Sequence, residues 1–304
     1  MNVALLWALA AFLLLAVGGS QGIRMLRHYR IGKKIRFDGP ASHQAKMGTP
    51  TMGGIMIIGV VLLVSMVSGL WASTSVALSL ATMCGFGLLG AYDDWLGLGD
   101  SKGVGLLARA KFPAQLALGI VAAWCTRGFV DLGVLSAPAA LFLVVGAANG
   151  VNITDGLDGL AGGTCAIAFA AYAVIARAQG QQDLASLSLV IFGALLGFLW
   201  HNVHPAAVFM GDVGSMALGS ALAMIALQSG QWVALSVVGL VFVIETLSVA
   251  LQVLYFKASR GKRLFRMAPL HHHLELTGWP EVQITQRLWI VSACAAVLVL
   301  AFTL

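Results

Sequence analysis

Charge is scarce in this sequence. Of its 304 residues only 10% are Asp, Glu, Lys or Arg and only 12 are acidic, whereas 59% are hydrophobic. Soluble folded domains carry about 25% charged residues, and disordered chains are poor in apolar residues, so both classes are excluded. The composition predicts an all-α integral membrane protein, in which an acidic residue beside an apolar run points to function.

Cysteine is scarce as well, with four residues that lie in apolar runs and show no Cys-x-x-Cys spacing. This pattern argues against a disulfide framework or a cysteine-ligated metal and favours small core residues. The first apolar run has no basic segment before it, and basic residues follow it at Arg24, Arg27 and Arg30. A cleaved signal peptide is therefore not expected. The sequence also lacks the inverted pair of interrupted helices that is typical of transporters.

The sequence does contain ten hydrophobic runs separated by short polar connections. A helix needs about 20 apolar residues to cross a bilayer, so the chain suffices for about ten transmembrane helices in a single polytopic membrane domain, residues 1–304. The runs lie near residues 2–22, 54–71, 75–92, 112–126, 135–151, 160–178, 184–200, 213–228, 232–256 and 286–304. Ten crossings place both termini on one side of the membrane.

The basic residues predict which side that is. Of the 18 Lys and Arg residues, all except Arg127 and Arg177 lie in the connections after the first, third and ninth runs or at the start of the tenth. Cytoplasmic loops are enriched in Lys and Arg, so these connections are predicted to be cytoplasmic and both termini extracytoplasmic. All seven histidines and most of the 12 acids lie on this same side. The active site is therefore expected on the cytoplasmic face.

Two polar clusters contain residues suited to phosphate or cation binding. The stretch Lys46 to Gly54 carries a cation and two hydroxyls before a helix whose N-terminal amides can receive phosphate oxygens, although a plain capped helix start explains it equally well. Asp93 and Asp94 end the third run, where negative charge opposes the helix dipole, so a functional role is favoured. Adjacent helical residues point about 100° apart, so the two carboxylates are expected to do different jobs.

A third cluster is an acid and amide ladder within the glycine-rich stretch 149–163. Its members recur at every third position, and they are Asn149, Asn152, Asp155 and Asp158. Glycines within the stretch predict that the helix breaks here and that the side chains converge. Such a ladder suits sugar hydroxyls, a nucleobase edge or an ion, and the alternative is an Asx-rich turn between two spans.

A fourth cluster runs from His201 to Ser215 and includes His204 and a lone carboxylate, Asp212, which opens another apolar helix. The residue is either a simple N-cap or, if it meets Asp93 or Asp94, part of an oxygen site suited to Mg²⁺, which takes one or two carboxylates, waters and substrate phosphates. Phe209, shortly before it, offers a ring for stacking.

The connection before the last run contains three consecutive histidines, His271, His272 and His273. They cannot all aim at one point on a helix or a strand, so a three-histidine zinc site is not expected. One or two of them are predicted to bind phosphate, with a structural run as the alternative. Glu245 lies in the middle of the ninth run, where a carboxylate indicates a functional or packing network, and we expect a bend near it.

The order and spacing of these clusters resemble a known family. The motifs lie at residues 36–40, 46–54, 93–94, 149–161, 209–215 and 269–281. They resemble the polyprenyl-phosphate N-acetylhexosamine-1-phosphate transferase superfamily. Within it, Pro-Leu-His-His-His followed by Gly-Trp-Pro-Glu resembles the phospho-N-acetylmuramoyl-pentapeptide-transferase family. The resemblance implies transfer of phospho-MurNAc-pentapeptide from UDP-MurNAc-pentapeptide to undecaprenyl phosphate, giving lipid I and UMP, with Mg²⁺ as cofactor. It also implies a role in peptidoglycan synthesis at the bacterial inner (plasma) membrane.

The resemblance also implies roles for individual residues. Asp212 resembles the magnesium ligand, and Asp93, supported by Asp94, resembles the carboxylate that either deprotonates the lipid phosphate or attacks directly. Phe209 is expected to stack on uracil. The uridine and nucleotide-sugar site is matched by Asn152, Asp155, Gly156, Leu157 and Asp158. Further polar positions of the cleft are matched by Lys46, Thr51, Asn202 and His271.

The chain departs from the family pattern at Gly97, where a lysine is expected three residues after the acid pair. Lys102 or Lys111 would then supply that cation. Two rival interpretations stay open, a related transferase that uses UDP-GlcNAc and, from a different class, a cation-coupled membrane transporter. The protein is expected to lie in a lipid bilayer, and no nucleic-acid partner is expected. Both a monomer and a homodimer are compatible with the sequence.

Overall fold

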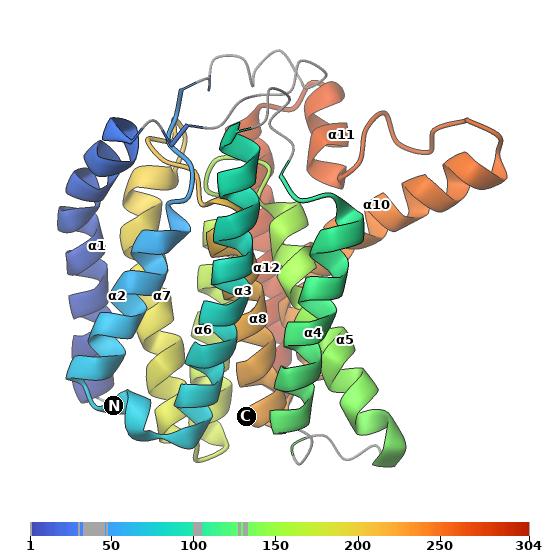
Figure 1. The fold of residues 1–304 in the computed structure, drawn as a ribbon. Helices are drawn as coiled ribbons and strands as arrows, with labels where there is room; N and C mark the ends of the chain where they lie inside the picture. Colours follow the sequence, from blue (N-terminus) through green and yellow to red (C-terminus); the bar gives the residue numbers. More distant parts are fainter. Residues whose placement is uncertain are drawn as a thin grey trace.

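The structure of the chain is built from helices (Figure 1). This computed structural model describes residues 2–29, 31–32, 46, 48–99, 105–126, 129 and 133–303. The α-helices are α1 Asn2–His28, α2 Gly54–Val67, α3 Thr74–Gly99, α4 Ala108–Thr126, α5 Ser136–Thr154, α6 Leu160–Ala178, α7 Gln182–Asn202, α8 Gly211–Gln228, α9 Leu235–Val238, α10 Leu240–Ala258, α11 Leu270–Leu276 and α12 Glu281–Thr303. Single 3₁₀ turns, Leu70–Ala72 and Gly133–Leu135, precede α3 and α5.

Each of the ten predicted hydrophobic runs contains a helix, and the predicted all-α class is confirmed. Among the described residues, seven helical segments are long and apolar enough to cross a membrane, and these include α1, α3, α5, α6, α7, α10 and α12. The chain is therefore an integral membrane protein by its helices. The count of ten crossings and the side on which the termini lie stay predictions, because α2 has only 14 residues and α4 and α8 fall outside the seven.

The ninth predicted run differs from expectation in where it breaks. The chain turns at Gly239, between α9 and α10, and α10 continues as a regular helix through Glu245. The bend expected near Glu245 therefore lies six residues earlier, at a glycine, where a departure from helical geometry costs least.

The centre of the bundle is α8, whose residues 213–228 are all buried. It packs between α3 and α5, and its many small side chains allow neighbouring backbones to come close. One close approach is at Gly90 of α3, where an added Cβ would collide with the carbonyl oxygen of Asp212. This contact places Asp93, one turn further along α3, beside the start of α8.

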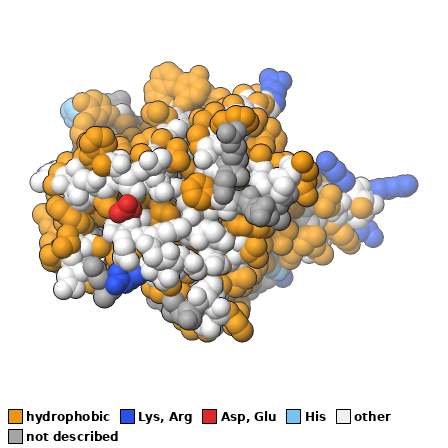
Figure 2. All heavy atoms as spheres, turned by 90° about the horizontal axis from the view of Figure 1, so that it is seen from below, with side chains coloured by type: hydrophobic (Ala, Val, Ile, Leu, Met, Phe, Trp, Pro, Cys, Tyr) orange, Lys and Arg blue, Asp and Glu red, His pale blue; other side chains and the backbone are white. Residues whose placement is uncertain are grey.

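The two ends of the bundle differ. In Figure 1, α1 begins and α12 ends at the lower end, while the chain connects α5 to α6 and α7 to α8 at the upper end. Seen from below, the surface is largely hydrophobic side chains and backbone, with few charged groups (Figure 2). The candidate functional residues lie at the opposite, upper end.

One helix leaves the bundle. The second half of α10 projects away from its neighbours (Figure 1), and Leu251, Leu254 and Phe256 on it are exposed. Exposing these apolar side chains to water would raise the free energy of the protein, whereas exposing them to lipid would not.

Candidate active site

Four helices bring polar side chains together at the upper end of the bundle. The Nζ of Lys111 on α4 lies 2.7 Å from Oδ2 of Asp93 on α3 and also pairs with Oδ2 of Asp212 on α8. Nδ2 of Asn152, on α5, donates to Oδ1 of Asp212 and to Oγ of Ser215, each at 2.9 Å. We call these five residues the Lys111 network. The structure thus brings Asp93 and Asp212 together, which is the condition that the sequence set for an oxygen site suited to Mg²⁺, and Lys111 supplies a cation near the acid pair.

The neighbouring acids Asp93 and Asp94 point to different partners, as their angle on the helix predicts. Asp93 uses Oδ1 to accept from the backbone N–H of Leu106. Asp94 uses Oδ2 to accept from the backbone N–H of Val213 at 3.1 Å, so it satisfies an N-terminal amide of α8. Met210 is the N-cap residue of α8, and Asp212 lies in the first turn of the helix. The N-cap explanation of Asp212 therefore does not hold, and Asp94 of α3 instead accepts from an amide at the start of α8.

The donor set of the Lys111 network suits a hard cation. Asp93, Asp212 and Ser215 all present oxygen atoms, which are the ligands that Mg²⁺ prefers. The ammonium of Lys111 lies between the two carboxylates, at a position where positive charge is favoured. With Asp94 nearby, the acids outnumber this one lysine, so the charge balance also leaves room for a divalent cation.

A second group also has the spacing of a metal site. Ligand atoms of Asp158, His204 and Glu281 lie within 4.8 Å of one another. As in the Lys111 network, an ammonium lies among the carboxylates, with Nζ of Lys46 2.7 Å from Oδ1 of Asp158 and 2.5 Å from Oε1 of Glu281. The difference is the imidazole of His204, which suits transition metals more than Mg²⁺. Of the two groups, the Lys111 network is the better match to magnesium.

We call Lys46, Asp158, His204 and Glu281 the Lys46 network. Asp158 is buried, and its Oδ2 accepts from Nδ1 of His204 at 3.0 Å and from the backbone N–H of Ala206 at 3.1 Å. Oε1 of Glu281 accepts from the backbone N–H of Asp158 at 2.7 Å. The network therefore ties Lys46 to the turn after α5 and to the first residue of α12.

The turn itself, residues 155–159, breaks the helix as expected, but the ladder does not converge as predicted, because Asn149 pairs with Gln115 and Asn152 with Asp212, whereas Asp158 belongs to the Lys46 network. The turn ends at Gly159, whose φ of +75° is unfavourable for other residues. Asn202 holds it, because its Oδ1 accepts from the N–H of Gly159 at 3.2 Å while its Nδ2 donates to the carbonyl of Val208 at 2.9 Å. Leu157 is buried in a small apolar cluster. Asp155 and Gly156 lie directly after α5, on the same turn.

Of the two interpretations of the stretch 46–54, an open phosphate cradle or an ordinary helix start, the structure favours the second at Gly53 and Gly54. The N–H groups of Gly53 and Gly54 donate to the carbonyls of Phe209 and Met210, each at 2.9 Å. These amides are therefore committed to the fold and do not form an open cradle. The contact places Phe209 with its ring centroid 6.0 Å from Nζ of Lys46. Thr51 is buried in the same stretch.

The three histidines have three different partners, as their spacing predicts. Nδ1 of His271 lies 3.1 Å from Oε2 of Glu245, and Nδ1 of His272 lies 2.7 Å from Oε2 of Glu275. Nδ1 of His273 accepts from the backbone N–H of Arg266 at 3.1 Å. They do not converge on one ion.

Some residues escaped the sequence reasoning or lie beyond the structure. Glu281 was noted only as part of a motif, because an acid in the first turn after a proline is also an ordinary helix start. Ser215 and His204 were recognised only as cluster members. The pairing of Glu245 with His271 joins segments 26 positions apart and has no local signal. Lys102 lies outside the described residues.

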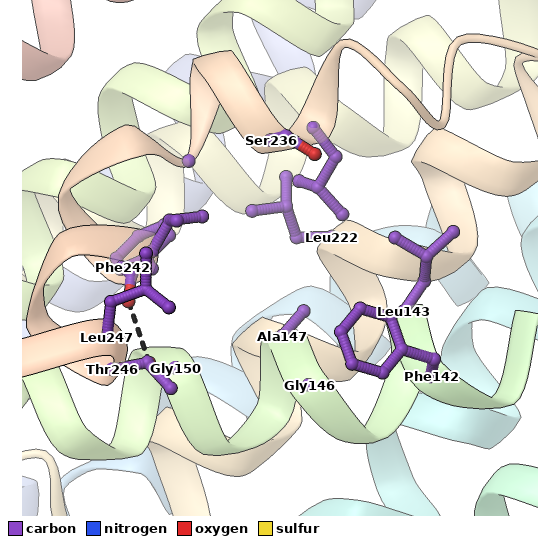
Figure 3. Close-up of a pocket in the computed structure, with 13 residues that line it drawn as sticks. Phe142, Leu143, Gly146, Ala147, Gly150, Leu222, Ser236, Phe242, Thr246 and Leu247 are labelled. Carbon is purple, nitrogen blue, oxygen red and sulfur yellow. Dashed lines mark hydrogen bonds between the residues drawn. The ribbon is translucent and has the colours of Figure 1, made fainter. Parts of the chain in front are cut away.

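An apolar cavity of about 240 Å³ opens beside α10. Figure 3 shows Phe142, Gly146 and Ala147 of α5 facing Phe242 and Leu247 of α10 across it, with Leu222 of α8 on the wall. Oγ1 of Thr246 donates to the carbonyl of Phe242 at 2.7 Å, so this polar group is satisfied within the helix. The lining is suited to a hydrocarbon chain.

Comparison of the sequence with known proteins shows the family of the chain. Residues 76–230 match glycosyl transferase family 4. Over 328 residues the chain is 43% identical to a phospho-N-acetylmuramoyl-pentapeptide-transferase of Chloroflexus aurantiacus, with 99% of this chain and 89% of the relative covered. The chain belongs to the phospho-N-acetylmuramoyl-pentapeptide-transferase family. Relatives of that name from Geobacillus kaustophilus (45% identity, 95% of this chain and 94% of the relative covered) and Halalkalibacterium halodurans (43%, 98% and 96%) agree.

The family resemblance noted in the sequence is thereby confirmed. The range that matches glycosyl transferase family 4 contains the Lys111 network and the turn 155–159. Lys46, Glu245, the three histidines and Glu281 lie outside it, in parts covered by the full-length phospho-N-acetylmuramoyl-pentapeptide-transferase relatives.

Proposed function

We propose that the chain transfers phospho-MurNAc-pentapeptide from UDP-MurNAc-pentapeptide to undecaprenyl phosphate, giving lipid I and UMP, in peptidoglycan synthesis. The observation that carries the proposal is the Lys111 network, in which acids from α3 and α8 meet a lysine from α4 at one end of an apolar bundle. Phosphoryl transfer depends mainly on alignment and on neutralising charge, and this network supplies fixed groups for both.

In this proposal Asp212 holds Mg²⁺. When bound, the ion neutralises the diphosphate and stabilises the leaving UMP. Asn152 holds Asp212 in place through its hydrogen bond to Oδ1. Lys111 screens the approach of two anionic substrates, and Asp94 keeps the start of α8 in register with α3. Asp93 either takes the proton of the lipid phosphate or attacks the diphosphate itself, and these two routes stay open.

The nucleotide is proposed to bind at the turn 155–159, with Phe209 stacking on uracil. The support is the arrangement of the Lys46 network, which brings Lys46 within reach of both the turn and the ring of Phe209. Asn202 contributes by holding the backbone of this turn, because both ends of its amide are already hydrogen-bonded to the protein. One or two of His271, His272 and His273 are proposed to approach the phosphates from α11.

The lipid substrate is proposed to enter beside α10. The cavity between α5 and α10 is apolar, and the projecting half of α10 is exposed to whatever phase surrounds the bundle. The upper end of the bundle is proposed to face the cytoplasm, since its connections carry nearly all the Lys and Arg residues. Basic connections there also attract anionic substrates to the site.

The test is turnover by the purified, lipid-reconstituted chain. We expect release of UMP from UDP-MurNAc-pentapeptide only when undecaprenyl phosphate and Mg²⁺ are both present. Chelation should stop the release, and added Mg²⁺ should restore it. Equal turnover of UDP-GlcNAc would favour the related GlcNAc-1-phosphate transferase. Absence of any metal-dependent UMP release would refute the proposal.

A further inference from the structure

A carboxylate and an imidazole are buried together inside the upper part of the bundle. The side chains of Glu245 and His271 are each only 1% exposed. Oε2 of Glu245 lies 3.1 Å from Nδ1 of His271, and it also accepts from the backbone N–H of His271 at 3.3 Å. The same oxygen thus fixes both the start of α11 and the ring that α11 carries.

Packing alone does not explain this pair. Burying ionisable groups is costly, and well-packed apolar residues of similar volume would usually be as stable or more stable. Two of its polar atoms, Oε1 of Glu245 and Nε2 of His271, are buried without a hydrogen-bond partner among the described residues. Such atoms raise the free energy of the folded state, so their presence needs an explanation other than stability.

The hydrogen bond also decides where the proton of His271 lies. A carboxylate only accepts hydrogen bonds, so Nδ1 of His271 carries a hydrogen when it faces Glu245. Nε2 is then the ring atom left to meet a ligand. It lies against Gly156, where an added Cβ would collide with it, so Nε2 points at the turn that follows α5.

We infer that Glu245 is a positioning residue that holds His271 with its proton on Nδ1 and with Nε2 directed at residues 155–157, part of the turn proposed to bind the nucleotide of the UDP-linked substrate. The inference rests on the proposed function, because it assigns to His271 a contact with the substrate. Glu245 itself touches no substrate and acts only through the ring. This role explains why a carboxylate stands in the middle of an apolar helix, and it differs from a role in binding the lipid chain.

The first test is spectroscopic and needs no turnover. Protein labelled with ¹⁵N-histidine is compared with Glu245→Met and Glu245→Gln, and the His271 signals are identified by their loss in His271→Gln. We expect a protonated Nδ1 in the wild type and in Glu245→Gln, whose amide oxygen still accepts. In Glu245→Met, which removes the acceptor, the proton should move to Nε2. Glu275→Gln is the matched control, because Glu275 pairs with the neighbouring His272 in the same way and its loss should leave the His271 signals unchanged.

The second test is a double-mutant cycle on UMP release. We expect Glu245→Met to lower kcat by about 10–100-fold while KM for each substrate changes by less than about 3-fold, the pattern for loss of a partner that orients a reacting group. Glu245→Gln should lie between this variant and the wild type. In the His271→Gln background, Glu245→Met should have no further effect, because residues that act through one another are not additive.

The two tests separate this inference from the proposed function. A wild type without UMP release would refute the transferase assignment, while the ¹⁵N signals would still report whether Glu245 sets the tautomer of His271. If the His271 signals are the same in Glu245→Met as in the wild type, or if the kcat losses of Glu245→Met and His271→Gln multiply, the positioning role is wrong. If Glu245→Met is not recovered folded, Glu245→Asp serves instead. Its shortened carboxylate should shift the same signals, and an unchanged spectrum would contradict the inference.

Discussion

The Lys111 network and the Lys46 network are built from the same chemistry but are held differently. In each, one ammonium lies between carboxylates from distant parts of the chain. The Lys111 network rests on long helices whose backbones touch at Gly90, whereas the Lys46 network joins a connecting segment, a turn and the first residue of α12. A group that aligns reacting atoms needs the first kind of support. A group that must release a product tolerates the second kind.

The largest effect is expected from removing a charge of the Lys111 network. Asp212→Asn and Asp93→Asn should each lower kcat by at least about 1000-fold, since a magnesium ligand or the base that handles the lipid phosphate is lost. UMP release measures the loss. The unfolding midpoint should change little, because Asn keeps the shape of Asp and Lys111 keeps one carboxylate partner. Turnover near the wild-type rate in either variant would remove that residue from the reaction.

The next effect concerns the backbone beneath that network. Gly90→Ala places a Cβ against the backbone of Asp212, and neither helix can yield without moving the site. We expect a loss of about 3 kcal/mol in unfolding free energy, at the upper end of the range for overpacking, together with loss of activity. Denaturant unfolding in detergent measures the change.

The control for Gly90→Ala lies on the same helix. Gly85→Ala meets only the end of the flexible Leu118 side chain, 3.3 Å from the new Cβ, and should cost far less. Equal destabilisation by both variants would mean that α3 and α8 do not depend on the close contact at Gly90.

Removing the charge of Lys46 should weaken binding of the UDP-linked substrate more than it slows the chemical step. Lys46→Met removes the cation that joins Asp158 to Glu281 and that lies near Phe209. A charge-assisted hydrogen bond contributes about 2 kcal/mol, so KM for the UDP-linked substrate should rise about 30-fold, with kcat within about 5-fold of the wild type. Steady-state kinetics of UMP release measure both. Lys257→Met, at the exposed end of α10, is the matched lysine and should leave this KM unchanged.

The two networks also differ in how far the sequence could predict them. Asp93 and Asp212 stand at the ends of apolar runs, where charge is costly, so their importance could be read from local pattern. The presence of the helices could likewise be predicted from the hydrophobic runs. The meeting of Asp93 with Asp212 was only a conditional expectation, since it depends on α3 packing against α8.

The contacts that sequence reasoning could not supply are those made by residues with an ordinary local explanation. Glu281 looks like a helix start, and Gly53 and Gly54 look like an open anion site. Their partners are fixed by the packing of distant segments, in the first case the turn at Asp158 and in the second the carbonyls of Phe209 and Met210. Tertiary packing therefore decided which of two local interpretations applied.

The smallest effect is expected outside both networks, in the cavity beside α10. Gly146 lines this cavity, and an added Cβ there meets nothing within 4 Å, so Gly146→Leu can place its side chain in the open space (Figure 3). If the lipid chain occupies the cavity, the leucine competes with it. KM for undecaprenyl phosphate should then rise about 5-fold, about 1 kcal/mol, while KM for the UDP-linked substrate stays the same.

The same substitution at Gly59 of α2, which also has open space around it, is the control and should change neither constant. A variant that alters kcat instead would show that the cavity communicates with the Lys111 network through α5, which carries both Gly146 and Asn152. Unchanged kinetics in Gly146→Leu would place the lipid chain elsewhere along α10. The candidate binding surface for the lipid chain would then be the exposed outer half of α10, since its apolar side chains are the remaining described surface of that helix suited to a hydrocarbon chain.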